Sequence, residues 1–369
     1  MNIYFWQRML TPHMTAIATA LSKRGYRVIY IAEKPLSKDR IKIGWEVQKN
    51  LDMQVIYVKN YSTVRLIIHN APKDSIHICQ GLRKNGVVSY VQKELRKKKL
   101  RQWIIMETIN DNGFIGIFKR IFYRFLILFY QKDIEIILAI GWRTSDWLIN
   151  LGLQSKKVFS FAYFLSPIKN SFLVKKKTNR PFKFIFIGEL IAGKKLDLLI
   201  LGLSLLKNRN FELIIVGDGP CKKKWKEYAK KLIPNRFSWM GIVKMSKIPK
   251  ILYTADCLVL PSEHDGWGAV ISESLIVGTP VICSDACGAA EVVRSSGFGG
   301  VFDSNKIKNL TLELKSILEL GALSKEKKII LSNWSKKITS DAGSKYLIDI
   351  INFANKKKLD RPIPPWDKK

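Results

Sequence analysis

The sequence predicts an α/β protein made of two doubly wound, Rossmann-like domains of similar size. The chain of 369 residues is longer than a typical single domain. Strand-like and helix-like segments alternate almost throughout, as in parallel sheets whose strands are joined by helices. This alternation is interrupted once, by a polar stretch that contains Pro167 and a lysine run. We therefore expect two domains that face a central cleft, with ligands at the carboxyl ends of the strands.

The first domain is expected over residues 1–165. It begins with a strand at 2–6, which is followed by a helix at 11–23, where Thr11 is a plausible N-cap and Pro12 occupies the first helical position. Gly25 ends this helix. Further strands are expected at 27–32, 54–58, 76–79, 103–106, 134–139 and 158–161.

Residues 166–180 read as a linker, residues 181–340 as the second domain, and residues 341–369 as a C-terminal helix and tail. Helices are expected at 195–206, 269–277 and 341–357. The Pro-rich tail at 361–366 suggests no function by itself. Strands of the second domain are expected at 182–187, 213–216, 237–240, 257–260 and 281–283.

The net charge of +33 is extreme, because 63 Lys and Arg face only 30 Asp and Glu. One explanation is a lysine-rich composition that merely solvates the surface. The other is attraction to an anionic partner. Lysine acts as a point charge, whereas base readout in DNA favours bidentate Arg, and no nucleic-acid-binding motif is recognisable. An anionic membrane surface is therefore the expected partner, and no specific nucleic acid is expected.

The five scattered cysteines indicate a reducing compartment rather than a disulfide framework. The sequence has no evident signal peptide and no run of about 18 apolar residues. We therefore expect a cytoplasmic protein, peripheral on the inner face of the cell membrane. Residues 113–130 are strongly apolar and aromatic, with Lys119, Arg120 and Arg124 as their charges. They predict either an interfacial membrane helix or a core helix with one exposed edge.

The most informative motif is Pro-Ser-Glu-His-Asp-Gly-Trp-Gly at 261–268, which follows a strand and leads into a helix containing Glu273. Loop amides and a helix N-terminus can bind an anion, and Gly266 and Gly268 allow close approach of a phosphate. Asp265 and Glu273 are carboxylates that can each accept hydrogen bonds from sugar hydroxyls. The alternative is an ordinary strand-loop-helix connection.

Two weaker motifs precede it. Gly188 ends a strand, and Lys194 and Lys195 lie near the start of the next helix, where a lysine can neutralise a diphosphate. A solvated lysine pair is the alternative in so basic a chain. Gly217 begins a Gly-Asp-Gly-Pro turn after a buried strand.

In this order, the motifs resemble the C-terminal domain of glycosyltransferase family 4, whose members have the GT-B fold. The resemblance is dense over 182–293 and includes Gly-Thr-Pro-Val-Ile at 278–282 and Glu-Val-Val at 291–293. It implies a retaining enzyme that uses a nucleoside diphosphate sugar as donor.

The resemblance also implies roles for individual residues. Glu273 would bind the donor ribose, Asp265 would contact the transferred sugar, and Lys194 would bind the diphosphate. Asp265 and Lys194 are the expected catalytic residues. The remaining donor-binding positions are Gly188, Gly217, Val243 beside the base, Gly266, and the amides of Ala269 and Val270 beside the phosphates.

Two positions depart from the family pattern. Glu189 replaces the usual diphosphate-binding Arg, so we expect it to point away or to pair with a lysine. Asp265 stands where Glu is usual. In the first domain, His13, His77 and Glu107 lie near expected strand or loop ends and are candidates for acceptor contacts, although a purely structural role is equally open for each.

The resulting hypothesis is a glycosyltransferase that acts on a glycan or lipid-linked glycan acceptor in bacterial envelope polysaccharide synthesis, such as lipopolysaccharide or capsule. Lysine and a helix N-terminus would stabilise the leaving diphosphate, so neither a metal nor another cofactor is expected. A sugar-nucleotide epimerase of the same fold and an inactive polyanion-binding scaffold are the alternatives.

Overall fold

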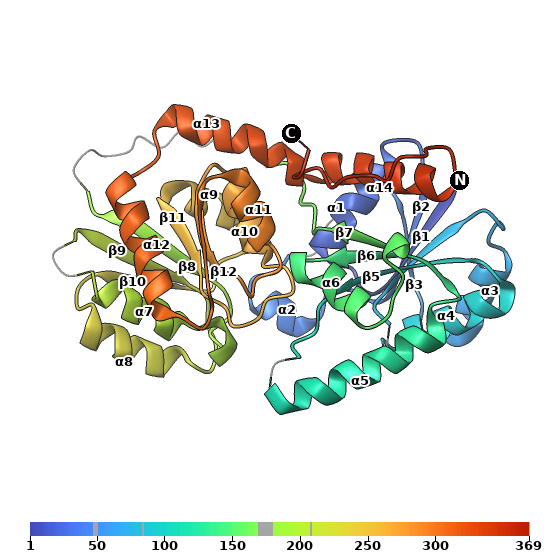
Figure 1. Ribbon diagram of the computed structural model, residues 1–369, viewed down its shortest axis with the longest axis horizontal. Helices are drawn as coiled ribbons and strands as arrows, with labels where there is room; N and C mark the ends of the chain where they lie inside the picture. Colours follow the sequence, from blue (N-terminus) through green and yellow to red (C-terminus); the bar gives the residue numbers. More distant parts are fainter. Residues whose placement is uncertain (47–50, 83–84, 112, 169–179, 207–208, 369) are drawn as a thin grey trace. The chain divides into compact units, whose positions relative to one another are not determined.

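The computed structural model describes residues 1–46, 51–82, 85–111, 113–168, 180–206 and 209–368, which form two compact units (Figure 1). Unit 1 comprises Met1–Lys38, Val47–Ser166 and Ser340–Pro364. Unit 2 comprises Asp39–Glu46, Pro167–Thr339 and Pro365–Lys369. Most of the linker expected at 166–180 lies outside the described residues. The C-terminal segment, expected as a separate helix and tail, is instead divided between the two units.

Unit 1 contains a seven-stranded, wholly parallel sheet of order β3-β2-β1-β4-β5-β6-β7. Helices cover both faces of the sheet, so the central strands are apolar on both sides, and β1 is buried continuously from Ile3 to Gln7. From β1 to β3 the strands follow one another toward one edge of the sheet, and from β4 to β7 toward the other, so the strand order reverses between β1 and β4. The strands are β1 (Asn2–Met9), β2 (Arg27–Lys34), β3 (Gln54–Tyr57), β4 (Ile76–Gln80), β5 (Arg101–Glu107), β6 (Ile134–Ile140) and β7 (Val158–Phe161).

One face of this sheet packs against α3 (Tyr61–His69), α4 (Val87–Lys98), α5 (Gly113–Tyr130) and α6 (Trp142–Asn150). Each of these helices contributes apolar side chains to a single core cluster, among them Val64, Val91, Tyr123 and Leu148. The other face carries α1 (Pro12–Ser22) and α14 (Ser340–Ala354), which pack against each other (Figure 1). No helix in the described part of the chain combines the length and apolarity needed to cross a membrane.

Helix α14 belongs to unit 1 although it follows unit 2 in the sequence. The Tyr346 hydroxyl donates to the Ser160 carbonyl at 3.1 Å, and Arg24 Nε donates to Ser344 Oγ at 2.8 Å. A Cβ at Gly343 would lie 2.3 Å from Phe164 Cγ, so only glycine lets this helix approach so closely. These contacts fix α14 as part of the first unit.

Unit 2 contains a six-stranded sheet of order β10-β9-β8-β11-β12-β13, also wholly parallel. Helices α7 (Leu196–Ser204), α8 (Lys222–Leu232) and α12 (Ile307–Leu320) form one layer, and α9 (Ile248–Thr254), α10 (Ala269–Ile276) and α13 (Lys325–Trp334) form another. Helix α11 (Ala290–Ser296) connects the last two strands. The strands are β8 (Phe182–Ile187), β9 (Phe211–Val216), β10 (Phe237–Gly241), β11 (Cys257–Leu260), β12 (Val281–Ser284) and β13 (Gly299–Phe302).

Candidate active site

The motifs of unit 2 meet at the point where its strand order reverses. Strand β8 is the first strand of this sheet, and its neighbours are β9 on one side and β11 on the other. The loops that leave the carboxyl ends of β8 and β11 therefore run in opposite directions and leave a crevice between them, where open α/β sheets bind their ligands. The loop after β8 carries Lys194, and the loop after β11 carries Asp265.

An ion pair joins these two loops. Lys194 Nζ donates to Asp265 Oδ2 at 2.5 Å, and the two side chains are 21% and 17% exposed. The backbone supports the same contact, because Glu263 N donates to the Gly193 carbonyl at 2.8 Å. The two residues expected to be catalytic are thus neighbours in space although 71 positions separate them in the sequence.

The loops after β8 and β9 pack so tightly that glycine is required at their contact. A Cβ at Gly217 would lie 1.9 Å from the Gly188 carbonyl oxygen, and a Cβ at Gly219 would lie 2.8 Å from Leu190 N. Leu190 N donates to the Asp218 carbonyl at 2.9 Å. The Gly-Asp-Gly turn therefore holds the loop that leads to Lys194.

Helix α10 exposes one stripe of residues and buries the rest. Ile271, Ser272, Ser274, Leu275 and Ile276 are buried, whereas Ala269, Val270 and Glu273 keep partial exposure. Positions i, i+1 and i+4 lie on one face of a helix. The three residues assigned to the donor are therefore the three that solvent reaches on this helix.

The start of α10 is set by Gly268, which has a φ of 84°. A Cβ there would also lie 3.1 Å from both Leu260 Cδ2 and Ile271 Cδ1. The first N–H groups of a helix have no partner within it, and the helix dipole places positive charge at this end. The N-terminus of α10 can therefore bind an anion beside the Lys194–Asp265 pair.

A second loop fixes the backbone on either side of Gly266. Asp265 N donates to the Ala286 carbonyl at 3.1 Å, Gly288 N donates to the Asp265 carbonyl at 2.9 Å, and Ala289 N donates to the Trp267 carbonyl at 2.8 Å. Gly288 is needed because a Cβ there would lie 1.9 Å from the Gly266 carbonyl oxygen. The loop conformation is thus largely set before any ligand binds.

Glu273 is a carboxylic acid in an unfavourable environment for charge. Burial raises its pKa from 4.5 to about 7, although part of the residue still reaches solvent. Among the described residues, no side chain or amide forms a hydrogen bond or ion pair with its carboxyl group. Because this carboxyl group has no partner among the described residues, it is free to accept hydrogen bonds from a ligand that brings hydroxyl donors, and such donors would favour its charged form.

Glu189 and Lys195 lie outside this arrangement. The Glu189 side chain is exposed and forms no ion pair with a described residue, so the alternative of a lysine partner is not seen among these residues. Lys195 pairs with Glu263 at 3.1 Å, and both of these side chains are over 40% exposed. Of the two adjacent lysines, only Lys194 reaches Asp265.

The loop that carries Val243, the residue expected to contact the base, borders a segment that the sequence did not suggest as its neighbour, Asp39–Glu46. Val243 keeps partial exposure in the loop after β10. Its carbonyl lies against Gly44, whose own carbonyl accepts from Met245 N at 2.8 Å. Glu46 accepts from Ser246 N at 2.7 Å. The segment Asp39–Glu46, which includes most of the short helix α2 (Lys38–Lys42), therefore borders this loop.

The three acceptor candidates of unit 1 have different environments. His77 has an exposed fraction of 0%, its Nδ1 accepts from Trp6 Nε1 at 3.0 Å, and its Nε2 lies 2.9 Å from Ser75 Oγ. Burial lowers its pKa to about 3, so it is a neutral core residue. The assignment of His77 to the acceptor is therefore wrong.

His13 and Glu107 both lie at the carboxyl edge of the unit 1 sheet. His13 is in the first turn of α1, directly after β1, and its ring stacks on Tyr163 with centroids 5.3 Å apart. Glu107 ends β5 and is partly exposed. Both remain candidates for contacts with a ligand at this edge.

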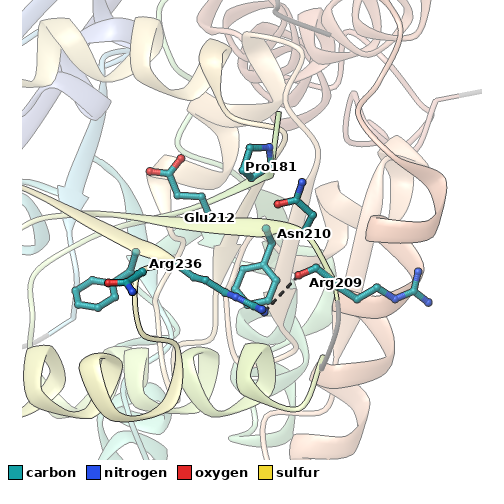
Figure 2. A pocket seen from close by; sticks show the side chains of 8 residues that line it. Pro181, Arg209, Asn210, Glu212 and Arg236 are labelled. Carbon is teal, nitrogen blue, oxygen red and sulfur yellow. Dashed lines mark hydrogen bonds between the residues drawn. The ribbon is translucent and has the colours of Figure 1, made fainter. Parts of the chain in front are cut away.

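A distinct pocket lies at the opposite edge of the unit 2 sheet. Figure 2 shows Pro181, Glu212 and Arg236 among the residues that line it. The pocket has a volume of about 490 Å³. All of its lining residues lie at or just before the amino ends of β8, β9 and β10. None of the motif residues lines it, and the carboxyl edge, not this one, is where doubly wound sheets bind substrates.

Comparison with known proteins finds a family match for the part of the chain that carries these loops. Residues 168–333 match the family model described as Glycosyl transferases group 1. An uncharacterized glycosyltransferase of Methanocaldococcus jannaschii is 28% identical over 112 residues, which are 30% of this chain and 29% of that protein. The 2-deoxystreptamine glucosyltransferase of Streptomyces kanamyceticus is 30% identical over 112 residues, with the same coverage of both chains. The matches thus span under a third of the length of these two relatives.

Solved structures extend the likeness to nearly the whole chain. The lipopolysaccharide outer core galactosyltransferase WaaB has a TM-score of 0.71 at 15% identity, covering 96% of this chain and 100% of that one. Anabaena HepE in complex with UDP and glucose has a TM-score of 0.69 at 15% identity, with the same coverage. The expected fold class is therefore confirmed: the chain has the two parallel-sheet, Rossmann-like domains of GT-B glycosyltransferase structures.

Proposed function

We propose that this protein is a retaining glycosyltransferase of family 4 that uses a nucleoside diphosphate sugar as donor. The observation that carries the proposal is the convergence of Lys194, Asp265 and the exposed stripe of α10 at the switch point of unit 2. Nothing in that arrangement requires a bound metal ion, because the lysine and the helix N-terminus both supply positive charge.

Different residues of the site contact different parts of the donor. Glu273 accepts hydrogen bonds from the two ribose hydroxyls, which satisfies its carboxyl group. The amides at Ala269 and Val270 face the phosphates. When the sugar leaves, negative charge develops on the diphosphate, and Lys194 stabilises it while Asp265 holds the lysine in place and contacts the sugar hydroxyls. The loop after β10, with Val243, contacts the base.

The acceptor in this proposal is a glycan or lipid-linked glycan of the bacterial envelope. The structural likeness to a lipopolysaccharide galactosyltransferase suggests this class. His13 and Glu107, at the carboxyl edge of the unit 1 sheet, are the residues proposed to contact it.

The experiment that tests this function uses the purified protein and a panel of UDP-, GDP-, ADP- and dTDP-sugars. Thermal stabilisation by one nucleotide class, with slow release of the matching nucleoside diphosphate, is the expected result. Conversion of a nucleotide sugar into its epimer without an acceptor would support the epimerase instead. Stabilisation by none of them would argue against a nucleotide-sugar enzyme.

Helix α5 supports a membrane-associated site of action. Its buried residues are Gly116, Tyr123 and Ile127, of which Tyr123 and Ile127 belong to the core cluster of unit 1. The opposite side presents large apolar side chains to solvent, of which Phe114 is 78%, Phe129 68% and Phe125 66% exposed. So wide an apolar face supports the membrane role more than it supports a core helix with one exposed edge.

The charges beside this face favour an anionic lipid surface as its partner. Arg124 is exposed among the aromatic residues. Lys119 and Arg120 also bond to the preceding loop, since Lys119 donates to the Asn110 carbonyl and Arg120 pairs with Asp111 at 3.1 Å. We therefore propose that the protein works as a cytoplasmic, peripheral membrane enzyme, with α5 lying in the interface and a lipid-linked acceptor close by.

A further inference from the structure

The C-terminal tail buries a tryptophan three residues before the end of the chain. Trp366 is only 3% exposed, whereas Ile363 in the same tail is 56% exposed. Residues 361–368 form neither helix nor strand. A large aromatic side chain that is buried in such a segment removes much apolar surface from water and so holds the segment against the protein.

Several contacts hold the tail on the way to this position. The Arg361 guanidinium donates to the carbonyls of Ser155 at 3.2 Å and of Val158, and it lies 4.3 Å from the centre of the Phe159 ring. These contacts are all within unit 1. Prolines at 362, 364 and 365 then restrict the backbone, which lowers the entropy lost when the tail becomes ordered. Beyond Trp366, Lys337 donates to the Lys368 carbonyl within unit 2.

The partner of Trp366 is the tryptophan of the donor loop. The ring centroids of Trp366 and Trp267 are 6.4 Å apart, with an angle of 52° between the planes. Trp267 is itself only 3% exposed, and its indole N–H donates to Ser272 Oγ at 3.1 Å. Ser272 is the residue before Glu273 on α10.

We infer that Trp366 is a positioning residue for the donor loop, acting through Trp267. Trp267 lies between Gly266 and Gly268, and neither glycine has a side chain that could hold the loop in place. The buried side chain of Trp267 therefore anchors this part of the loop to the protein interior, in addition to the backbone hydrogen bonds with residues 286–289. Trp366 packs against that anchor, so the tail helps to hold Asp265 and the N-terminus of α10 in the arrangement that binds a nucleoside diphosphate. This inference rests on the proposed function.

Removal of Trp366 should weaken binding without changing the number of sites. Without its neighbour, Trp267 has room to move, and the loop spends part of its time in conformations that do not bind. If the competent arrangement is populated about one tenth of the time, the apparent Kd rises about tenfold. Loss of folded protein would instead lower the binding stoichiometry and leave Kd unchanged.

The test compares the full-length protein with Trp366→Ala, Trp366→Phe and the control Ile363→Ala. Isothermal titration with UDP, GDP, ADP and dTDP gives Kd and stoichiometry, and hydrogen exchange reports on the amides of residues 262–273 without any ligand. We expect Trp366→Ala to raise Kd about tenfold at constant stoichiometry and to speed exchange in this loop. Trp366→Phe should restore most of both, and Ile363→Ala should match the wild type.

Two results would overturn the inference. One is unchanged exchange at 262–273 in Trp366→Ala, and the other is a rise in exchange spread equally over unit 2. The exchange measurement needs no nucleotide, so it decides the role of Trp366 even if no nucleoside diphosphate binds the wild type. Failure of every nucleoside diphosphate to bind the wild type would count against the proposed function and not against the contact between tail and loop. If Trp366→Ala does not fold, Trp366→Phe carries the same comparison with a smaller change.

Discussion

Replacement of Glu273 by Gln should make the ligand-free protein more stable at alkaline pH while it removes donor binding. The carboxyl group has its pKa raised from 4.5 to about 7 by burial. In the unfolded chain the same group has an ordinary pKa. Between these two values the folded state holds more protons than the unfolded state, so stability falls as the pH rises from about 4.5 to 7. Above 7 the loss is complete.

The size of the effect follows from the two pKa values. Their difference, 7 minus 4.5, corresponds to about 3.4 kcal/mol at about 1.36 kcal/mol for each pKa unit. This is an upper limit, because Glu273 keeps partial contact with water, which screens its charge. A neutral Gln does not incur this loss. We therefore expect Glu273→Gln to gain up to about 3 kcal/mol in unfolding free energy at pH 8 and almost nothing at pH 4.

Urea denaturation at several pH values measures the gain, and titration with the nucleotide that stabilises the wild type measures the loss. A charged hydrogen bond contributes about 1.5–3 kcal/mol, so Kd should rise by roughly ten- to a hundredfold. The control is Glu263→Gln, a 48% exposed carboxylate on the same loop, which should show no pH-dependent gain. Equal stability of Glu273→Gln and wild type at pH 8, together with unchanged affinity, would refute the reasoning.

Three further predictions concern the diphosphate, the metal and the membrane. Lys194→Ala should weaken nucleoside diphosphate binding more than Lys195→Ala, because only Lys194 contacts Asp265. Titration of both variants measures the difference, and a larger effect of Lys195→Ala would contradict the prediction. Sugar transfer should persist in excess EDTA, and activity that is lost on chelation and restored by manganese or magnesium would show a metal-dependent mechanism. In sedimentation with anionic vesicles, Phe118→Ser and Phe125→Ser together should reduce binding, and Arg124→Ser should reduce it about fivefold, since each basic residue contributes about 1 kcal/mol. The control Leu312→Ser changes an exposed leucine on α12 and should bind like the wild type. Equal binding of all variants to neutral and anionic vesicles would exclude a membrane-binding role for α5.

The positions of most strands in both units follow from local signals that the sequence displays clearly. Strands such as β7 and β11 are short apolar runs between helices, and their observed bounds are those expected. Strand β13 was not anticipated, because it begins with two glycines, which are uncommon in strands. The structure explains the first of them: Gly299 has a φ of 117°, and a Cβ there would lie 1.9 Å from the Val281 carbonyl oxygen.

The site was predictable where its residues follow a strand directly, and less so elsewhere. Asp265 and Lys194 could be placed because the carboxyl ends of parallel strands share an edge. His77 was misassigned because a histidine near a strand end looks the same in sequence whether it faces solvent or, as here, lies between Trp6 and Ser75. Trp366 and the segment Asp39–Glu46 give no local signal, since their importance lies in contacts with residues far away in the chain.

The return of α14 to unit 1 limits how this protein can be recombined with its relatives. A chimaera joined at residue 166 would pair one parent's first half with the other parent's α14. The Gly343–Phe164 contact and the hydrogen bond from Tyr346 to the Ser160 carbonyl would then have to form between residues from different parents. Exchange of the complete first unit would require residues 340–364 to be exchanged together with the first half. The last residues from Pro365 onward would stay with the parent that supplies Trp267, so a functional hybrid needs a second junction within the tail.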